Sequence, residues 1–153
     1  MDTVFKSDQV YIVSKKLGIT QKDVKTILDS YVDRIYAKLR AGETVKFLNI
    51  CYLVPDGGSR GRYLETLSYI SNDIGVETKL GKETVYRVLS ELGNFITEDV
   101  QKFYSYTIRG VVNISLEEYR RGVCKVRLRK SKPFKEMGVS VVTLNSFKRK
   151  VEG

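Results

Sequence analysis

Histidine and tryptophan are missing from this chain of 153 residues, and cysteine, proline and methionine occur only twice each. The absence of histidine excludes His-dependent triads, imidazole proton shuttles and the commonest metal ligand. Cys51 and Cys124 lie far apart in the sequence without a C-x-x-C pair, so neither a zinc site nor a disulfide framework is predicted. A chain of this size and apolar content builds one compact domain or two very small ones.

Long apolar runs are also missing. No stretch approaches the roughly 18 residues needed to cross a bilayer, and residues 1–6 lack the apolar block of a signal peptide. We therefore expect a soluble intracellular protein in a reducing compartment that makes no membrane contact.

Motifs for enzyme chemistry are absent as well. Gly57 to Gly61 is too short and misplaced for a phosphate loop, and Gly81-Lys-Glu-Thr lacks a hydroxyl residue directly after its lysine. The carboxylate pairs Glu98-Asp99 and Glu117-Glu118 have no convergent base or oxyanion donor, and we interpret them as surface charges. These observations predict a non-enzymatic protein that uses no cofactor, metal or small-molecule substrate.

Positive charge is abundant and localised. Lys and Arg number 27 against 18 Asp and Glu, which gives a net charge of +9. Residues 1–65, 66–118 and 119–153 carry +3, −3 and +9, so the last segment alone supplies the whole excess. This distribution favours a basic surface for a polyanion or an acidic protein partner, with an ordinary solvated face as the alternative.

An internal repeat organises the chain. An apolar stripe with helical spacing recurs 61 residues later, and each stripe follows a shorter helical segment and precedes β-rich residues. The two stripes are Val24, Ile27, Leu28, Tyr31, Ile35, Leu39 and Val85, Val88, Leu89, Leu92, Ile96, Val100. Each unit therefore predicts a short helix, a turn, a longer helix and a pair of strands.

Turn and cap residues agree with this assignment. Gly18 and Gly75 are expected to end the short helices as left-handed C-caps. Thr20, with Asp23 three residues on, is a predicted N-cap, and Gly81 holds the corresponding position in the second unit. The glycine-rich stretch after Pro55 predicts a linker between the units.

The pattern resembles the HU/IHF family of small bacterial DNA-bending proteins. Leu17-Gly-Ile-Thr20 and Gly42-Glu-Thr-Val45 are similar to the family's helix–turn–helix and first strand. Val126 to Gly138 resembles the last strand and the Pro-Phe stretch before the family's C-terminal helix, which would then be residues 144–151.

This resemblance implies an α+β fold of two tandem HU/IHF-like units that form one pseudo-dimeric body with a short C-terminal helix. The expected divisions are a truncated first unit at 1–55, a linker at 56–62, and a second unit at 63–153 that contains the basic strand and the helix. The two helix stripes are expected to share one core, because each unit alone has few apolar residues.

The sequence departs from the family in the device that bends DNA. Family members carry a long two-stranded arm tipped by a proline that wedges between base steps. Neither unit here is expected to have such an arm, since residues 117–122 suggest only a tight hairpin connection. The two prolines, Pro55 and Pro133, fall in the linker and before a helix, so no wedge is predicted.

The strongest functional signal is the basic stretch 123–132. Alternation places Lys125, Arg127 and Arg129 on one face of a predicted strand, above a core-facing side of Cys124, Val126 and Leu128. The candidate residues for contact with DNA or with an acidic partner are Arg120, Arg121, Lys125, Arg127, Arg129, Lys130 and Lys132. Contacts of this kind to phosphates supply affinity without base specificity and weaken with salt.

Two functions fit these features. The first is a structural role, because the pattern also resembles IHF-like proteins of tailed, notably crAss-like, phages that serve as tail ring proteins. It predicts self-association into a ring in the virion, contact with other virion proteins, and assembly in the host cytoplasm. The alternative is an architectural, sequence-nonspecific protein that binds double-stranded DNA and is cytoplasmic and nucleoid-associated.

Overall fold

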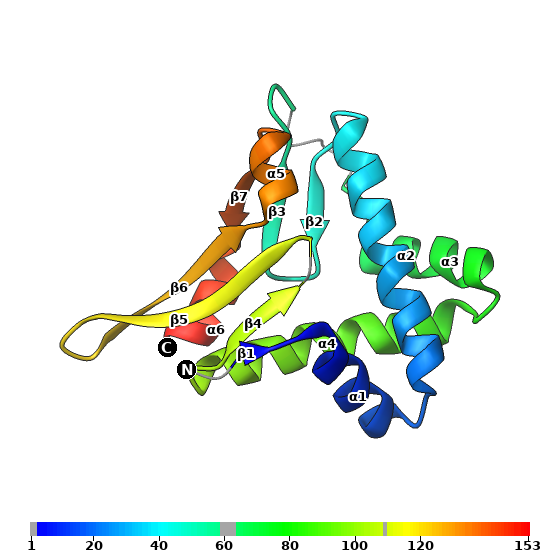
Figure 1. The fold of residues 1–153 in the computed structure, drawn as a ribbon, viewed down its shortest axis with the longest axis horizontal. Helices are drawn as coiled ribbons and strands as arrows, with labels where there is room; N and C mark the ends of the chain where they lie inside the picture. The colour runs from blue at the N-terminus through cyan, green and yellow to red at the C-terminus, as the bar shows by residue number, and fades with distance from the viewer. Residues whose placement is uncertain (1–2, 59–63, 109) are drawn as a thin grey trace.

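The computed structural model describes residues 3–58, 64–108 and 110–153, and within these ranges the fold is mixed α+β (Figure 1). Helices and strands alternate in blocks along the chain. The helices are α1 (Lys6–Leu17), α2 (Gln21–Arg40), α3 (Leu67–Thr78), α4 (Lys82–Gln101), α5 (Lys132–Glu136) and α6 (Asn145–Glu152). The strands are β1 (Thr3–Val4), β2 (Val45–Phe47), β3 (Cys51–Val54), β4 (Ser105–Ile108), β5 (Val112–Arg120), β6 (Val123–Lys130) and β7 (Ser140–Thr143).

The two long helices, α2 and α4, supply much of the core. Every residue of both predicted apolar stripes is buried, so the helical periodicity in the sequence is confirmed as the packing surface. The stripes join a single buried cluster with Val10 and Val13 of α1, Ile70 and Ile74 of α3, and residues of both sheets. One shared core therefore holds the two halves of the chain together.

Three of the four predicted helix boundaries are confirmed. Gly18 is a left-handed C-cap with φ +68°, the Thr20 hydroxyl accepts a hydrogen bond from the Asp23 N–H at 3.2 Å, and Gly81 is the N-cap of α4. The prediction for Gly75 was wrong, because α3 continues to Thr78 and Lys79 is its left-handed cap. Gly75 instead lies inside α3, where the backbone of Gly81 passes close to it.

The strands form two sheets, with orders β1-β4-β5-β6 and β2-β3-β7. The β4-β5-β6 and β2-β3-β7 pairings are antiparallel, and only the two-residue β1 runs parallel to its neighbour β4. Strand β7 lies late in the chain yet completes the sheet that β2 and β3 begin. The sheet of β2, β3 and β7, which we call the first sheet, therefore contains strands from both sides of the expected division at 56–62. The sheet of β1, β4, β5 and β6 is called the second sheet. Residues 59–62 of the expected division lie outside the described ranges.

The two sheets share one pattern of register. Val45 pairs with Leu53 as Tyr106 pairs with Ile114, which is a shift of 61 residues on both strands. The third strands also correspond: Leu53 faces Val141, and Ile114 faces Leu128. Strand β7 thus holds in the first sheet the place that β6 holds in the second.

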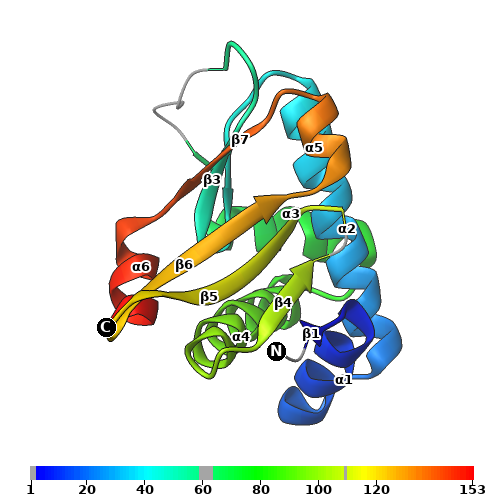
Figure 2. The same cartoon turned by 60° about the vertical axis from the view of Figure 1, so that its left-hand side comes forward.

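A short helix follows each third strand and is fixed in the same way. The Ser131 N–H at the start of α5 donates to the Val111 carbonyl, and the Leu144 N–H at the start of α6 donates to the Ile50 carbonyl, each at 2.9 Å. Both helices bury a phenylalanine, Phe134 in α5 and Phe147 in α6. The predicted C-terminal helix at 144–151 is confirmed by α6, which packs against α4 and β6 (Figure 2).

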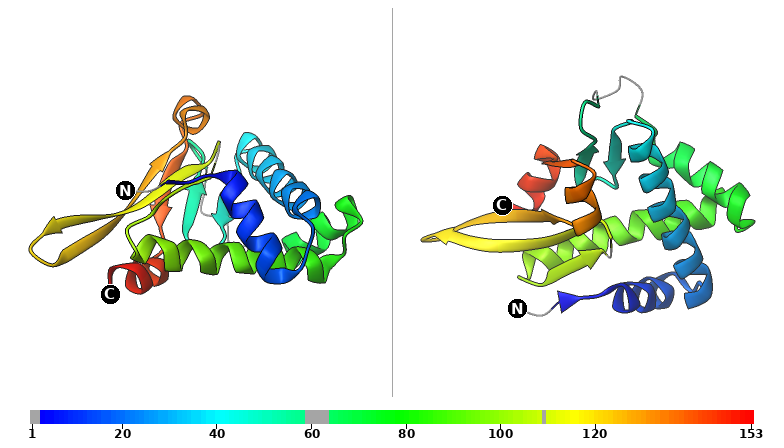
Figure 3. Two further views of the ribbon diagram at one scale, coloured as in Figure 1. Left: turned by 60° about the horizontal axis from the view of Figure 1, so that its bottom comes forward. Right: turned by 45° about the horizontal axis from the view of Figure 1, so that its top comes forward.

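A two-stranded hairpin of β5 and β6 extends beyond the sheet, contrary to the expectation that both units lack an arm. Strand β4 pairs with β5 only as far as Ile114, whereas the β5–β6 pairing continues from Ser115 and Arg127 to Arg120 and Val123. The connection is shorter than predicted because Arg121 and Gly122 alone form the turn, with Gly122 at φ +73°. The tip of the hairpin projects past α6 and away from α1, α2 and α3 (Figures 1 and 3).

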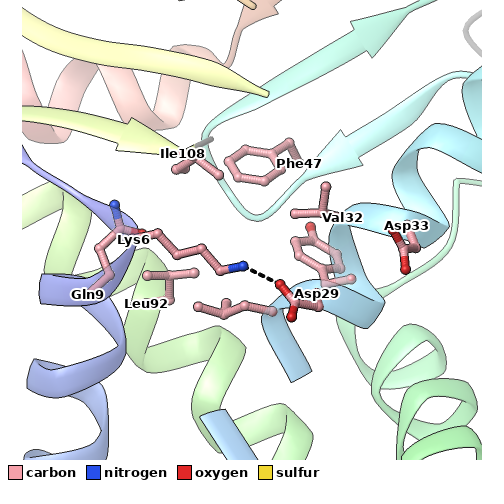
Figure 4. A pocket seen from close by; sticks show the side chains of 10 residues that line it. Lys6, Gln9, Asp29, Val32, Asp33, Phe47, Leu92 and Ile108 are labelled. Atoms are coloured by element: carbon pink, nitrogen blue, oxygen red, sulfur yellow. Dashed lines mark hydrogen bonds and ion pairs between the residues drawn. The ribbon is translucent and has the colours of Figure 1, made fainter. Parts of the chain in front are cut away.

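A small cavity lies where the two halves of the core meet (Figure 4). It has a volume of about 300 Å³, and its apolar wall includes the corresponding residues Phe47 and Ile108. An ion pair between Lys6 of α1 and Asp29 of α2 crosses its edge. No helix in the described part of the chain is both long and apolar enough to cross a membrane.

Candidate nucleic-acid interface

The basic residues of β6 are arranged as their alternation predicts. Lys125, Arg127 and Arg129 are exposed, while Cys124, Val126 and Leu128 are partly buried on the opposite side of the strand. The side chains of Arg127 and Arg129 keep more than half of their surface in solvent. These cations therefore form a row along one face of the hairpin and can reach a ligand without any rearrangement of the core.

The same face continues across β5 and β4 with polar residues. Cross-strand pairing places Ser115 beside Arg127 and Asn113 beside Arg129, and Thr107 of β4 lies next to Asn113. The Ser105 hydroxyl donates to the Asn113 side-chain oxygen at 2.9 Å and fixes that amide. Alternate residues of β5, such as Ile114, face the core instead. We refer to Lys125, Arg127, Arg129, Asn113, Ser115 and Glu117 as the basic face.

Glu117 is the one acidic member of the basic face. It pairs with Lys125 across the strands, and its carboxylate lies 3.2 Å from Arg127 Nη1 and 3.6 Å from Arg129 Nη2. These ion pairs are exposed, so each contributes little to stability. Their effect on a ligand is larger, because they engage the groups that a phosphate would contact.

The tip of the hairpin carries an exposed aromatic residue that the sequence analysis did not select. A register shift between Glu118 and Arg120 places Tyr119 in a bulge, where it remains 62% exposed. Its ring lies 4.5 Å from Lys125 Nζ and 5.5 Å from the Arg120 guanidinium, measured to the ring centroid. Tyr119 therefore joins the tip to the basic face and offers a flat surface between two cations.

The structure brings together only part of the predicted contact set. Arg120 and Arg121 are exposed at the tip, close to Lys125 through Tyr119. The Lys130 ammonium instead donates to the Val139 carbonyl at 2.9 Å, which ties the end of β6 to the segment before β7. Lys132 is exposed but lies on α5, beyond the end of the strand.

Nucleophiles and metal ligands do not gather elsewhere in the described residues. Burial raises the pKa of the Cys51 thiol to about 12, which keeps it protonated at neutral pH. Among residues 3–58, 64–108 and 110–153, no cluster of three acidic or cysteine side chains could hold a metal ion. The basic face is thus the candidate site with the clearest chemistry.

The fold and this face define a mixed α+β protein with a projecting basic hairpin. In a comparison with models of protein families, residues 4–55 match the family described as bacterial DNA-binding protein, which is the HU/IHF family. The matched region contains α1, α2 and the β2–β3 hairpin and spans about a third of the chain. Neither the curated proteins nor the solved structures gave a significant match.

Proposed function

We propose that the protein is an architectural, sequence-nonspecific protein of HU/IHF type that binds double-stranded DNA and has no enzymatic role. The observation that carries this proposal is the match of residues 4–55 to a DNA-binding family. The match favours DNA binding over the ring-forming virion role, which finds no support in it. The corresponding location is the bacterial nucleoid.

The basic face supplies the chemistry that this function requires. Guanidinium and ammonium groups in a row neutralise backbone phosphates, and the polar side chains of Asn113 and Ser115 add neutral hydrogen-bonding groups. The hairpin places Lys125, Arg127 and Arg129 at alternate positions of a regular strand and leaves their side chains in solvent. We assign the phosphate contacts to these three residues, together with Arg120 and Arg121 at the tip.

The proposal includes an intramolecular pseudo-dimer. The matched registers of the two sheets and the matching hydrogen bonds of Ser131 and Leu144 support two corresponding units within one chain. In this arrangement, the second unit is inserted between β3 and β7 of the first. A single chain would therefore provide the body that two separate subunits provide in a dimer.

The two units differ in charge at the positions that would meet DNA. In the sheet of β5 and β6, Arg127 pairs with Ser115 and Arg129 pairs with Asn113. At the corresponding positions of β3 and β7, Ser140 pairs with Val54 and Val142 pairs with Tyr52. Ser140 and Val142 therefore replace the two arginines in the first sheet. We place the main phosphate contacts on the second sheet and its hairpin for this reason.

A salt titration of DNA binding tests the proposal. The wild-type protein should bind a mixed-sequence duplex of about 30 bp with submicromolar affinity near physiological salt, and log K should fall linearly with log salt. The variant Arg127→Glu/Arg129→Glu should lose this binding. The matched control is Lys22→Glu/Lys25→Glu, which changes the net charge equally but alters exposed residues of α2 at a distance from the hairpin (Figure 1).

Two results would contradict the proposal. One is wild-type binding no stronger than that of a generic basic protein of similar charge. The other is an equal loss of binding in both double variants, which would show that net charge alone is responsible. Self-association stays a prediction, and light scattering with and without duplex DNA measures it directly.

A further inference from the structure

Glu117 lies at the centre of the basic face, and its contacts set it apart from the other acidic residues of the hairpin. Its two carboxylate oxygens are divided between the arginines: Oε2 accepts from Arg127 Nη1 at 3.2 Å, and Oε1 lies 3.6 Å from Arg129 Nη2. Lys125 is its direct cross-strand neighbour. One carboxylate thus lies among three cations.

A phosphate and the Glu117 carboxylate can bind the same guanidinium groups. Both are anions that accept hydrogen bonds from guanidinium N–H groups, so they compete for the same donors on Arg127 and Arg129. A phosphate oxygen bound to these donors would lie close to the Glu117 carboxylate, and the two negative charges would repel each other. The carboxylate must therefore swing away or remain as a local source of repulsion.

We propose that Glu117 is an intramolecular competitor that determines how strongly the basic face binds phosphates. This inference rests on the proposed DNA-binding function. In the free protein, the carboxylate holds the arginine side chains on the face and cancels one of the positive charges. A duplex displaces it because several closely spaced phosphates act together, whereas an isolated anion meets an arginine pair that is already occupied.

The next residue on the strand provides a matched control. Glu118 pairs with Cys124, whose side chain lies on the opposite side of β6 from Arg127 and Arg129. Glu118 is exposed, and its substitution by glutamine changes the net charge by the same amount as substitution of Glu117. The two variants therefore separate direct competition at the arginines from the general effect of net charge.

The experiment measures duplex binding by fluorescence anisotropy across a range of salt for wild type, Glu117→Gln and Glu118→Gln. We expect Glu117→Gln to bind about tenfold more tightly at low salt, as the loss of two exposed ion pairs would allow. Its plot of log K against log salt should also be steeper by about one unit, because one more cation becomes available to phosphate. Glu118→Gln should change affinity by less than about threefold and leave the slope unchanged.

A second background tests whether the effect passes through the arginines. In Arg127→Gln/Arg129→Gln protein, the Glu117→Gln substitution should no longer raise affinity, since the groups it competes for are gone. Circular dichroism and thermal melting of each variant establish that the hairpin change leaves the fold intact.

The outcomes are distinct. Equal gains for Glu117→Gln and Glu118→Gln would overturn the inference and leave the proposed function standing. Weaker binding by Glu117→Gln would also overturn it, because the carboxylate would then position the arginines for DNA. If neither wild type nor either variant bound duplex, the proposed function itself would fail, and the inference would fail with it.

Discussion

Gly75 offers a direct test of how closely α3 approaches the start of α4. A Cβ atom at this position would lie 2.5 Å from the carbonyl carbon of Gly81 and 2.6 Å from the backbone nitrogen of Lys82. Both opposing atoms belong to the main chain, so no side-chain rotation relieves the contact, and α3 must move away from α4. Overpacking of this kind costs about 1–3 kcal/mol. The better helix propensity of alanine offsets up to about 1 kcal/mol of that cost.

We therefore expect Gly75→Ala to lower the free energy of unfolding by about 1–2 kcal/mol. The matched control is Gly93→Ala in α4, where the new Cβ would meet only Leu48 Cβ at 3.9 Å, an ordinary contact. The free energy of unfolding of that variant should rise by about 0.5–1 kcal/mol, because alanine replaces glycine inside a helix. Urea denaturation followed by circular dichroism measures both values. A Gly75→Ala protein as stable as Gly93→Ala would refute the close approach of the two backbones.

Two further stability predictions concern two buried phenylalanines and the partly buried Glu65. Phe134→Ala and Phe147→Ala should each lower the free energy of unfolding by about 3–5 kcal/mol, because both residues are fully buried at corresponding places. Phe5→Ala, at a residue that is 57% exposed, should change little in the same urea titration. Burial opposes the ionisation of Glu65, yet hydrogen bonds from Arg34 and Lys38 hold the pKa of its carboxyl below the usual value. The ionised carboxylate therefore contributes to the free energy of unfolding above the usual pKa, and this contribution is lost as pH falls through the lowered pKa. Glu65→Gln should thus cost up to about 1 kcal/mol at pH 7 and converge with wild type in acid; a constant difference across pH would contradict this.

Periodicity and cap chemistry explain how much of the fold was predictable. The stripes of α2 and α4 follow from helical spacing, and the positions of Gly18, Thr20 and Gly81 follow from local backbone needs. Gly75 was misassigned because an internal glycine and a C-cap glycine look alike in sequence. Only the close passage of Gly81 distinguishes them, and that is a tertiary contact.

The sheets were less predictable because their pairing is nonlocal. Strand β7 has only four residues, and nothing in its local sequence indicates that it completes the sheet of β2 and β3. The hairpin length was underestimated because Glu117 to Arg120 is polar and was interpreted as a connection. The missing signal was the two-residue turn at Arg121 and Gly122, which extends the β5–β6 pairing and brings Glu117 and Tyr119 into the candidate site.

The long separation of β3 and β7 in the chain, which makes their pairing nonlocal, also makes the proposed DNA-binding surface one-sided. In the second sheet the third strand follows its neighbour through a two-residue turn, so the pair can grow into a projecting hairpin. In the sheet of β2, β3 and β7, the corresponding strands β3 and β7 are separated in the chain by residues 55–139, and their pairing ends at Val54 and Ser140 without a projecting extension. Ser140 and Val142 then stand where Arg127 and Arg129 stand in the second sheet. In the proposed manner of binding, the cations of the hairpin would neutralise the duplex phosphates mainly along one side. Any bending of the duplex would therefore centre on the hairpin of β5 and β6.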